Sequence, residues 1–379
     1  MKVAKRASIA PFHAMEVLRA ANARAASGAE VLHMEVGEPS GGAPAAVIEA
    51  AKRALDAERI GYTEALGIPA LREGLSRHYR EVHGLDVPAE RIVATTGSSG
   101  GFLLAFLSAF DAGDRIALAN PSYPAYRNIL NALGLEAVSL PAGPETNFQP
   151  SPALLGQAGK LDGVLIASPA NPTGAMFAPG ALGGLLAYCR SAGIRVISDE
   201  IYHGITYGRA AESALAFGSD AIVINSFSKY FSMTGWRIGW MVVPEDLLRP
   251  VERLAQNLFI SPPALAQHAG VAALGCRAEC DAKVESYRRN RALMLETLPK
   301  AGFEIAAPAD GAFYIYADVR KLTNDSAEFC RRMLAETGVA ATPGIDFDVA
   351  RGNAYMRFSF AGSEADIAEA MRKLRAWSR

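Results

Sequence analysis

Short apolar runs recur through the first two thirds of the chain, and most are followed by a turn and a segment with helical spacing. The runs are RIVATTG (91–97), DRIALAN (114–120), DGVLIAS (162–168), GIRVISD (193–199), AIVINSF (221–227) and RIGWMVV (237–243). Helix-like segments such as 100–110 and 179–192 separate several of them. Apolar strands that alternate with helices predict an α/β fold, with a mostly parallel sheet covered by helices on both faces.

The pattern changes near residue 245, where the sequence becomes helical through about residue 298. After it come GAFYIYADV (311–319), a helix near 325–338, AYMRFSFA (354–361) and a final helix over 363–377. This order predicts a second, smaller α+β domain. We expect residues 40–275 to form the large domain, and residues 1–39 to pack with residues 276–379 in the small one.

Polar, turn-rich clusters follow five of the predicted strands. They are GSSGG after 91–96, NPSYPAY after 114–119, PANPTG after 162–168, Asp199-Glu200 with Tyr202 after 193–198, and Ser226 to Lys229 after 221–225. In open α/β sheets ligands bind at the carboxyl ends of the strands. The five clusters are therefore expected to meet in one crevice.

Charge and composition exclude several classes of partner. The chain has 379 residues and a formal net charge of -1, so no basic field would attract nucleic acid or an anionic membrane. The N-terminus lacks an unbroken apolar segment, and the longest apolar stretch, 102–110, is too short to span a bilayer. The four cysteines match no zinc spacing, so we expect no metal site and a cytoplasmic protein with reduced thiols.

The stretch GSSGG admits three interpretations. It fits the G-x-S-x-G elbow of serine hydrolases, with Ser99 as the nucleophile. It also fits a phosphate cradle at a helix N-terminus, and it could be a flexible turn. The elbow needs a histidine on a loop late in the chain, but the last one, His268, lies in a helical pattern. That weakens the hydrolase.

Lys229 closes the stretch Ser226-Phe227-Ser228-Lys229, which fits the S-x-x-K motif of penicillin-binding enzymes. The accompanying S-D-N and K-T-G tripeptides are absent from the chain, so this alternative is poor. Lys229 could be a surface lysine in a loop. It could also be a Schiff-base lysine whose amine is activated by burial or by nearby cations.

The remaining candidates each have a structural alternative. Asp199 could cap a helix or face a cationic ring nitrogen, and Asn171 lies in an ordinary turn. Tyr123 and Tyr202 could simply pack, although Tyr123 could also be a stacking platform. Arg237, close to two serines, fits a phosphate monoester better than a structural ion pair.

Strand alternation in AYMRFSFA separates an apolar side from a milder one. Met356, Phe358 and Phe360 fall on one side, and Arg357 falls on the other between Tyr355 and Ser359. Arg357 is thus a lone cation, awaiting either a protein carboxylate or the carboxylate of a substrate.

Together these residues meet the needs of one cofactor. Pyridoxal phosphate requires a lysine for its aldehyde, an acid at its ring nitrogen, donors at its ring oxygen, an aromatic over its face and an anion cup. The chain resembles the class I/II aminotransferases, the aspartate-aminotransferase-like, fold type I group of pyridoxal-phosphate enzymes. The resemblance rests on MEVGEP (34–39), GYTEALGIPALREGL (61–75), TTGSSGG (95–101), NPSYPAY (120–126), SPANPTG (168–174), DEIY (199–202), SFSKYFSMTGWRIGW (226–240), GAFYIY (311–316), PGIDF (343–347) and MRFSF (356–360).

The resemblance implies a role for each candidate. Lys229 holds pyridoxal 5'-phosphate as a Schiff base and then moves protons, and Asp199 pairs with the ring nitrogen. Asn171 and Tyr202 bond the ring oxygen, and Tyr123 stacks on the ring. The phosphate is held by Ser98, Ser99, Ser226, Ser228 and Arg237. Tyr62 is expected to reach the phosphate of a neighbouring subunit, which implies a homodimer with shared sites.

The implied activity is a ping-pong transfer of the amino group of an L-amino acid to a 2-oxo acid. Arg357 is expected to bind the substrate carboxylate, helped by Asn171 and the backbone N–H of Gly37. Residues near Ile9, Phe12 and Tyr314 are expected to line the side-chain pocket. The alternatives are another reaction of the same cofactor, such as C–S lysis, the hydrolase through Ser99, or a non-catalytic effector-binding module.

Two positions depart from the family pattern. Gly101 stands where alanine is frequent, which predicts a looser first turn of the helix that follows. Asp348 stands where glycine is usual, which leaves the local turn in doubt.

Overall fold

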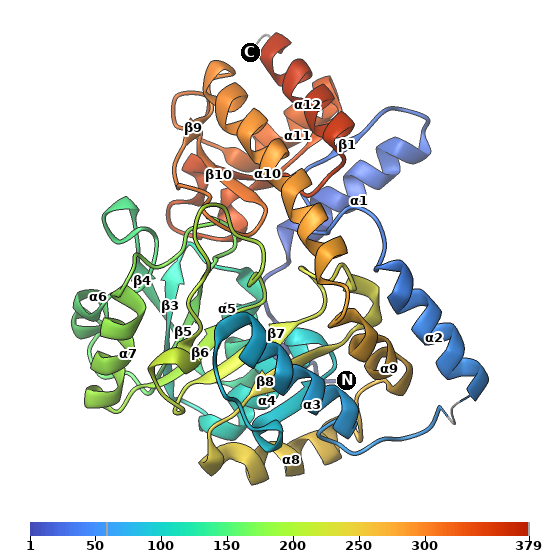
Figure 1. Ribbon diagram of the computed structural model, residues 1–379. Helices are drawn as coiled ribbons and strands as arrows, with labels where there is room; N and C mark the ends of the chain where they lie inside the picture. The colour runs from blue at the N-terminus through green and yellow to red at the C-terminus, as the bar shows by residue number, and fades with distance from the viewer. Residues whose placement is uncertain (58–59, 378–379) are drawn as a thin grey trace.

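A seven-stranded sheet forms the centre of the larger part of the molecule in the computed structural model, which describes residues 1–57 and 60–377 (Figure 1). Its strands are β2 (Ile92–Thr95), β3 (Arg115–Asn120), β4 (Glu136–Pro141), β5 (Gly163–Ala167), β6 (Arg195–Asp199), β7 (Ile222–Ser226) and β8 (Gly239–Val242). Their order is β2-β8-β7-β6-β5-β3-β4. Only β8 runs antiparallel to its neighbours, so the predicted mostly parallel α/β sheet is confirmed.

Both faces of this sheet are covered, because alternate residues of each strand point to opposite sides. Leu165 packs with α4 (Gly97–Ala109), α5 (Pro124–Leu133) and α8 (Glu245–Leu258), whereas Val164 and Ile166 face the opposite layer. That layer contains α3 (Pro69–His78), α6 (Pro152–Gln157), α7 (Ala181–Ala192) and α9 (Ala264–Ala273). His268 lies inside α9, as its helical pattern predicts.

A smaller antiparallel sheet has the order β12-β13-β10-β9. Its strands are β9 (Glu304–Ile305), β10 (Tyr314–Asp318), β12 (Thr342–Pro343) and β13 (Tyr355–Ser359). The helices around it are α1 (His13–Ala26), α11 (Ser326–Thr337), α12 (Glu364–Ala376) and part of α10 (Arg277–Lys300). Strand β1 (Leu32–His33) pairs with β11 (Val339–Ala340), so the N-terminal region contacts the C-terminal one. The domain limits at residues 40 and 275 stay a prediction.

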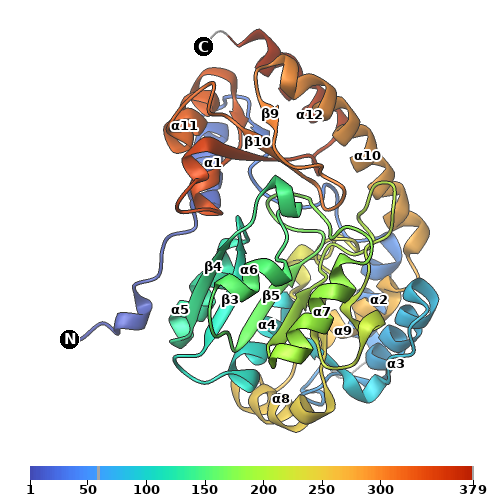
Figure 2. The same ribbon diagram turned by 90° about the vertical axis from the view of Figure 1, so that its left-hand side faces the viewer.

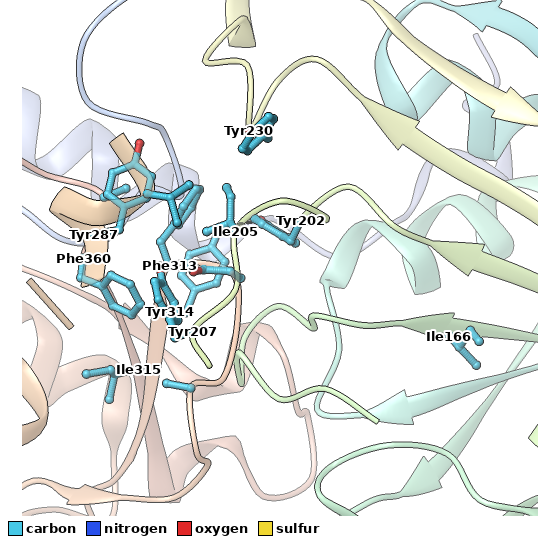
Figure 3. Packing of buried hydrophobic residues seen from close by; sticks show 14 of the residues in the cluster. Ile166, Tyr202, Ile205, Tyr207, Tyr230, Tyr287, Phe313, Tyr314, Ile315 and Phe360 are labelled. Carbon is cyan, nitrogen blue, oxygen red and sulfur yellow. Dashed lines mark hydrogen bonds between the residues drawn. The ribbon is translucent and has the colours of Figure 1, made fainter. Parts of the chain in front are cut away.

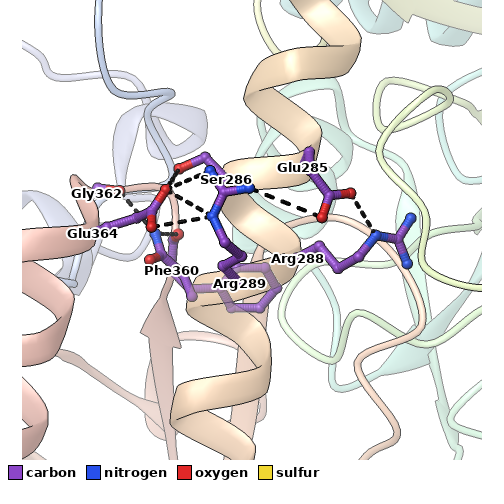
Figure 4. Close-up of polar contacts among 8 residues, drawn as sticks. Glu285, Ser286, Arg288, Arg289, Phe360, Gly362 and Glu364 are labelled. Carbon is purple, nitrogen blue, oxygen red and sulfur yellow. Dashed lines mark hydrogen bonds and ion pairs between the residues drawn. The ribbon is translucent and has the colours of Figure 1, made fainter.

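The long helix α10 joins the two parts, and its polar contacts hold the start of α12 (Figure 4). Arg289 donates to both carboxylate oxygens of Glu364, with an Nη2–Oε1 distance of 2.6 Å. The buried Asn290 donates to the carbonyls of Phe360 and Gly362 at 3.0 and 2.9 Å. Helix α2 (Ala45–Ala57) packs on α9, and the segment before α1 reaches α5 (Figure 2).

Aromatic side chains join the loops of the large sheet to the small one (Figure 3). The Tyr202 ring, after β6, lies edge-on to Phe313 and Tyr314, with centroids 5.4 and 5.7 Å away. The backbone N–H of Ala312 donates to the Ile205 carbonyl at 2.9 Å. The carboxyl ends of the large-sheet strands are thereby fixed against β10, and the main cavity lies between them.

Candidate active site

A cavity of about 610 Å³ opens where the large sheet meets the small one, and it collects most of the predicted site residues. Those that line it are Gly37, Ser98, Ser99, Tyr123, Asn171, Asp199, Tyr202, Ser228, Lys229, Arg237 and Arg357. Two predicted residues do not line it. Ser226 lies beneath the wall, and the Tyr62 side chain is 84% exposed elsewhere on the surface.

Lys229 reaches into the cavity just beyond the end of β7. Its Nζ donates to the carbonyl of Gly37 at 2.6 Å, and no carboxylate pairs with it within the described residues. Burial, and then the positive charge of Arg357, lower the pKa of the Lys229 ammonium to about 8. A sizeable fraction of the amine is therefore neutral near physiological pH, which makes it a nucleophile and a base.

Asp199 ends β6 and is almost fully buried. Its Oδ1 accepts from the backbone N–H of Ile201 at 3.0 Å, and its Oδ2 accepts from the hydroxyl of Tyr126. Burial raises the pKa of Asp199 to about 6, although these two hydrogen bonds act in the opposite direction. At neutral pH Asp199 is thus an anion with two donors, placed to face a cation in the cavity.

Sequence reasoning missed Tyr126. The residue is the last of the NPSYPAY stretch, in which Tyr123 was the predicted stacking aromatic. Tyr126 lies in α5, three residues after the N-cap Tyr123, and the two rings meet edge-on at 5.3 Å. This i, i+3 spacing was the available signal, because it places both rings on the same face of a helix.

An anion cup forms where α4 begins. Gly97 has φ +65°, and a Cβ there would lie 2.3 Å from Nη2 of Arg237, so only glycine lets the guanidinium approach the helix start. Ser98 and Ser99 occupy the first turn of α4, whose free N–H groups favour an anion. Arg237 is itself held in the left-handed region at φ +50°.

Ser226 supports this cup from behind. Its Oγ donates to the carbonyl of Ile238 at 3.1 Å and accepts from the backbone N–H of Ser228 at 3.1 Å. Its Oγ also lies 2.9 Å from the Oγ of Ser228. Ser226 therefore orients Ser228, which does line the cavity, and direct contact between Ser226 and the phosphate stays a prediction.

Arg357 lies on the opposite wall, on β13, with its apolar neighbours Met356 and Phe358 in the core as alternation predicts. It is only 3% exposed, and its guanidinium stacks between the rings of Tyr314 and Phe347, 4.4 and 4.7 Å from their centroids. Nη1 donates to Oδ1 of Asn171 at 2.9 Å.

Among the described residues, the Arg357 guanidinium has no carboxylate partner. Its Nη2 donates to the Thr342 hydroxyl at 3.1 Å and to the Glu35 carbonyl, whereas its Nε is buried without a hydrogen-bond partner. In the described part of the chain no acid forms an ion pair with it. A buried cation without a counter-ion is costly, and a ligand carboxylate would compensate it.

The tyrosine contacts partly match the predicted roles. The hydroxyls of Tyr202 and Tyr314 lie 2.8 Å apart, so Tyr202 already has a protein partner. Burial raises the pKa of Tyr202 well above its ordinary value, so the hydroxyl stays protonated and able to donate. Tyr123 presents its ring to the cavity, with Phe12 edge-on to it at 5.8 Å.

The side-chain pocket is only partly where the sequence placed it. Phe12 and Tyr314 line the cavity, but Ile9 lies outside its wall and is half exposed. Met15 and Val36 line it as well and were not predicted. The lining position of Met15 depends on how α1 sits on the small sheet. Asp346 fixes that position by accepting from the backbone N–H groups of His13 and Ala14 at 3.1 and 3.0 Å.

The two departures from the family pattern have local explanations. Gly101 lies within a regular α4, and a Cβ there would come 3.2 Å from Ile224, so glycine lets the helix lie close to β7. Asp348 is buried and accepts from Asn120 at 2.8 Å and from Nε of Arg351 at 2.7 Å. The turn that was in doubt is therefore fixed by a carboxylate.

Other chemistries find little support in the described part of the chain. No histidine lines the cavity, so Ser99 lacks the base that a hydrolase needs. The described residues contain no group of three or more histidine, cysteine or acidic side chains placed to hold a metal. None of the helices described is both long and apolar enough to cross a membrane.

Comparison with known proteins gives consistent matches. The model of the family described as aminotransferase class I and II matches residues 29–374. A valine–pyruvate aminotransferase of Mycobacterium tuberculosis is 49% identical over 99% of this chain and 98% of its own length.

Solved structures agree. A crystal structure of an aminotransferase from Mycobacterium tuberculosis superposes with a TM-score of 0.97 at 48% identity, covering 100% of this chain and 99% of that one. Aspartate aminotransferase from Thermus thermophilus with maleate superposes with a TM-score of 0.92 at 30% identity, covering 99% of both chains.

Proposed function

The chain belongs to the class I and II aminotransferases, and from that membership we propose that it uses pyridoxal 5'-phosphate to aminate and deaminate neutral aliphatic substrates. The observation that carries the proposal is Lys229. Its amine, with a pKa lowered to about 8, shares one cavity with the anionic Asp199 and with the anion cup at Arg237. A lysine, an acid and a phosphate cup around one cavity are the groups that this cofactor requires.

The residues present fit the cofactor. Lys229 would hold its aldehyde end, Asp199 its ring nitrogen, Asn171 and Tyr202 its ring oxygen, and Tyr123 its face. The cup formed by Ser98, Ser99, Ser228 and Arg237 would hold the phosphate, with Gly97 leaving the room that a Cβ would fill. When bound, pyridoxal phosphate supplies a carbonyl that accepts the amino group and a ring that withdraws electrons from the substrate α-carbon.

The protein's own residues then bind the substrate and move its proton. Arg357 holds the α-carboxylate, and Asn171 assists with its Nδ2, because its Oδ1 already accepts from Arg357. Gly37 contributes the backbone N–H, at a position where a Cβ would lie 1.7 Å from the hydroxyl of Tyr314. Lys229, once its amine is free, takes the proton from the substrate α-carbon as a general base. The same amine gives a proton back to the α-carbon when the reaction runs in the reverse direction.

The cavity wall indicates the substrate class. Its cations are Lys229, Arg237 and Arg357, and each already has an assigned partner. No cation of the described wall is left for a second carboxylate, and Glu38 adds a negative charge. Phe12, Met15 and Val36 provide apolar surface instead. We therefore propose neutral aliphatic amino acids such as valine or alanine, in agreement with the name of the valine–pyruvate relative.

Turnover by the protein reconstituted with pyridoxal phosphate tests this. With pyruvate as acceptor, kcat/KM for valine should exceed that for aspartate by at least about tenfold, since the aspartate side-chain carboxylate would stay unpaired. Higher activity with aspartate would contradict the substrate assignment while leaving the transamination intact.

We also propose a homodimer with shared sites. Tyr62 is exposed, as are Ile60, Leu258 and Ile260. The N–H of Thr63, next to Tyr62, donates to the hydroxyl of Ser261 at 3.3 Å, so the segments that carry these side chains meet. Apolar side chains exposed together favour association with a second copy.

Mixed dimers of Lys229→Ala and Tyr62→Ala subunits test the sharing. One of the two sites would be intact in such a dimer, so mixing two weak variants should restore activity. No gain on mixing, with mixed dimers demonstrated by mass spectrometry, would contradict the shared site.

A further inference from the structure

The segment after β6 sends side chains toward two different cavities. Asp199 and Tyr202 line the active-site cavity, whereas His203 lines a second cavity of about 460 Å³. The last residue of β7 and the turn after it divide in the same way, because Ser226 lines the second cavity and Ser228 the first. The two cavities therefore share a wall, and a charge in that wall is felt at the active site.

Within this wall, the hydrogen bonds of His203 define its tautomer. Its Nε2 lies 3.1 Å from the carbonyl of Ser168, and a carbonyl only accepts, so Nε2 carries the hydrogen. In the neutral ring Nδ1 is then a bare acceptor. It points at Oε2 of Glu200, 3.5 Å away.

Glu200 is equally constrained. Its Oε1 accepts from the hydroxyl of Ser198 at 3.1 Å and from the backbone N–H of Ala214 at 2.8 Å. Its Oε2 has no hydrogen-bond partner, and neither has Nδ1 of His203. The side chains are 1% and 5% exposed, so water cannot readily satisfy either atom. Two buried acceptors that face each other without a proton would both remain unsatisfied.

We propose that Glu200 and His203 hold one proton between them at neutral pH, and that this keeps a second negative charge away from Asp199. The role in catalysis rests on the proposed function, whereas the shared proton does not. The direction of the pKa changes agrees, because burial raises the pKa of Glu200 and lowers that of His203 to about 4. An ionised Glu200 would raise the pKa of Asp199.

The other titratable groups around the pair do not replace this proton. The His83 ring, from the turn Tyr79–His83, lies 5.5 Å from that of His203, and His78 lies 6.2 Å beyond it. Burial lowers the pKa of both rings to about 4, so they are neutral at pH 7, and buried Tyr79 also stays neutral. Arg277 and Asp281, from α10, and Glu81 line the second cavity as exposed residues. In the described part of the chain, His203 alone lies within ion-pair distance of Glu200.

Spectroscopy of the apoprotein tests the proton directly. At pH 7 we expect either an infrared band of a protonated carboxyl group that disappears in Glu200→Gln, or a doubly protonated His203 in nitrogen-15 NMR. The amide group that Glu200→Gln introduces would donate to Nδ1 of a neutral His203, so the wall should stay intact in that variant. A carboxylate at Glu200 together with an unprotonated, unbonded Nδ1 would overturn the proposal. No cofactor is needed, so this outcome is independent of the transamination.

A double-variant cycle tests the effect on Asp199. In His203→Asn the amide N–H can donate to Oε2 of Glu200 and so favours the carboxylate. With Glu200 ionised, the acid limb of kcat/KM should move up by about one pH unit. Glu200→Gln should not move it upward. The double variant should return toward the wild-type profile, because no charge remains to be compensated. A double variant shifted as far as His203→Asn, or no shift in His203→Asn, would overturn the role.

Discussion

The two walls of the active-site cavity surround their arginine side chains with different groups. On the large-sheet wall, Arg237 lies against the start of α4 and donates to the carbonyl of Thr234 at 2.9 Å, in a cup of hydroxyl and N–H groups that only an anion completes. On the small-sheet wall, Arg357 lies between two rings with its Nε unpaired. The Asp199 carboxylate, on the large-sheet wall, has hydrogen-bond donors at both of its oxygens within the protein.

This difference is what we expect between a wall that binds a cofactor permanently and a wall that binds a substrate only during turnover. The large-sheet wall is prepared on several sides, as a site for a permanently held cofactor should be. On the small-sheet wall, in the proposed function, a substrate carboxylate would compensate the buried cation. Binding energy released there is available for orienting the substrate at Lys229.

The largest effect is expected from Lys229→Ala, which removes the base from the large-sheet wall. Turnover should fall by a factor on the order of 10⁴ or more, because proton transfer at the α-carbon loses its general base. The cup and Asp199 are untouched, so the variant should still bind pyridoxal phosphate without a covalent bond. Steady-state kinetics and equilibrium dialysis measure the two, and full activity would refute the assignment.

Arg357→Leu, on the small-sheet wall, should lower kcat/KM by a factor on the order of 10²–10³, since one partner of a buried charge pair is lost. The apoprotein should at the same time melt at an equal or higher temperature, because an uncompensated buried cation is removed. Arg357→Lys keeps the charge without the fork and serves as the matched variant. A marked loss of apoprotein stability in Arg357→Leu would show that the cation is structural.

Tyr126→Phe should have a smaller effect, confined to pH dependence. The Tyr126 hydroxyl stabilises the Asp199 carboxylate, so its removal raises the pKa of Asp199 above about 6. The acid limb of kcat/KM should therefore move upward by about one pH unit, with little change on the alkaline side. Tyr123→Phe, at the N-cap of the same helix, is the control. An unmoved acid limb would mean that Asp199 is held by burial and Ile201 alone.

The smallest effect concerns stability away from both walls. Burial lowers the pKa of His78 and His83 to about 4 from an ordinary 6.5, so the unfolded chain binds protons more readily than the folded one. Stability should be complete above pH 6.5 and should decline as pH falls toward 4, by at least about 1 kcal/mol for the two residues. Urea unfolding of wild type and of His83→Gln over that range measures it, with His268→Gln as control. Equal pH slopes for wild type and His83→Gln would contradict it.

Periodicity in the sequence predicted the α/β class and the strands from β2 to β8 except β4. That strand, Glu136–Pro141, lies at the sheet edge with mixed exposure, so its residues do not form the apolar run of a buried strand. The strand-end rule predicted which side chains would meet, because parallel strands deliver their carboxyl ends to one edge. It could not predict Ser226 beneath the wall, which depends on the local turn.

Contacts between distant segments explain most of what the sequence did not predict. Tyr126 bonds Asp199 across 73 positions, and Asp346 caps α1 across more than 300. In both cases the sequence around one residue gives no indication of its distant partner. The Glu200–His203 pair could not be predicted from the sequence for a different reason. The two residues are close in sequence, but their protonation depends on the Ser168 carbonyl and on their burial, which only the structure shows.

A single half-reaction tests the central claim most directly. The protein, reconstituted with pyridoxal phosphate and freed of excess cofactor, is mixed with valine in the absence of any 2-oxo acid, and the visible spectrum and the released oxo acid are followed together. The account predicts loss of the yellow absorption, one equivalent of 2-oxo acid per site, and return of the absorption on adding pyruvate. A spectrum that valine leaves unchanged would contradict valine as the substrate, and one unchanged by every amino acid tried would contradict transamination at Lys229.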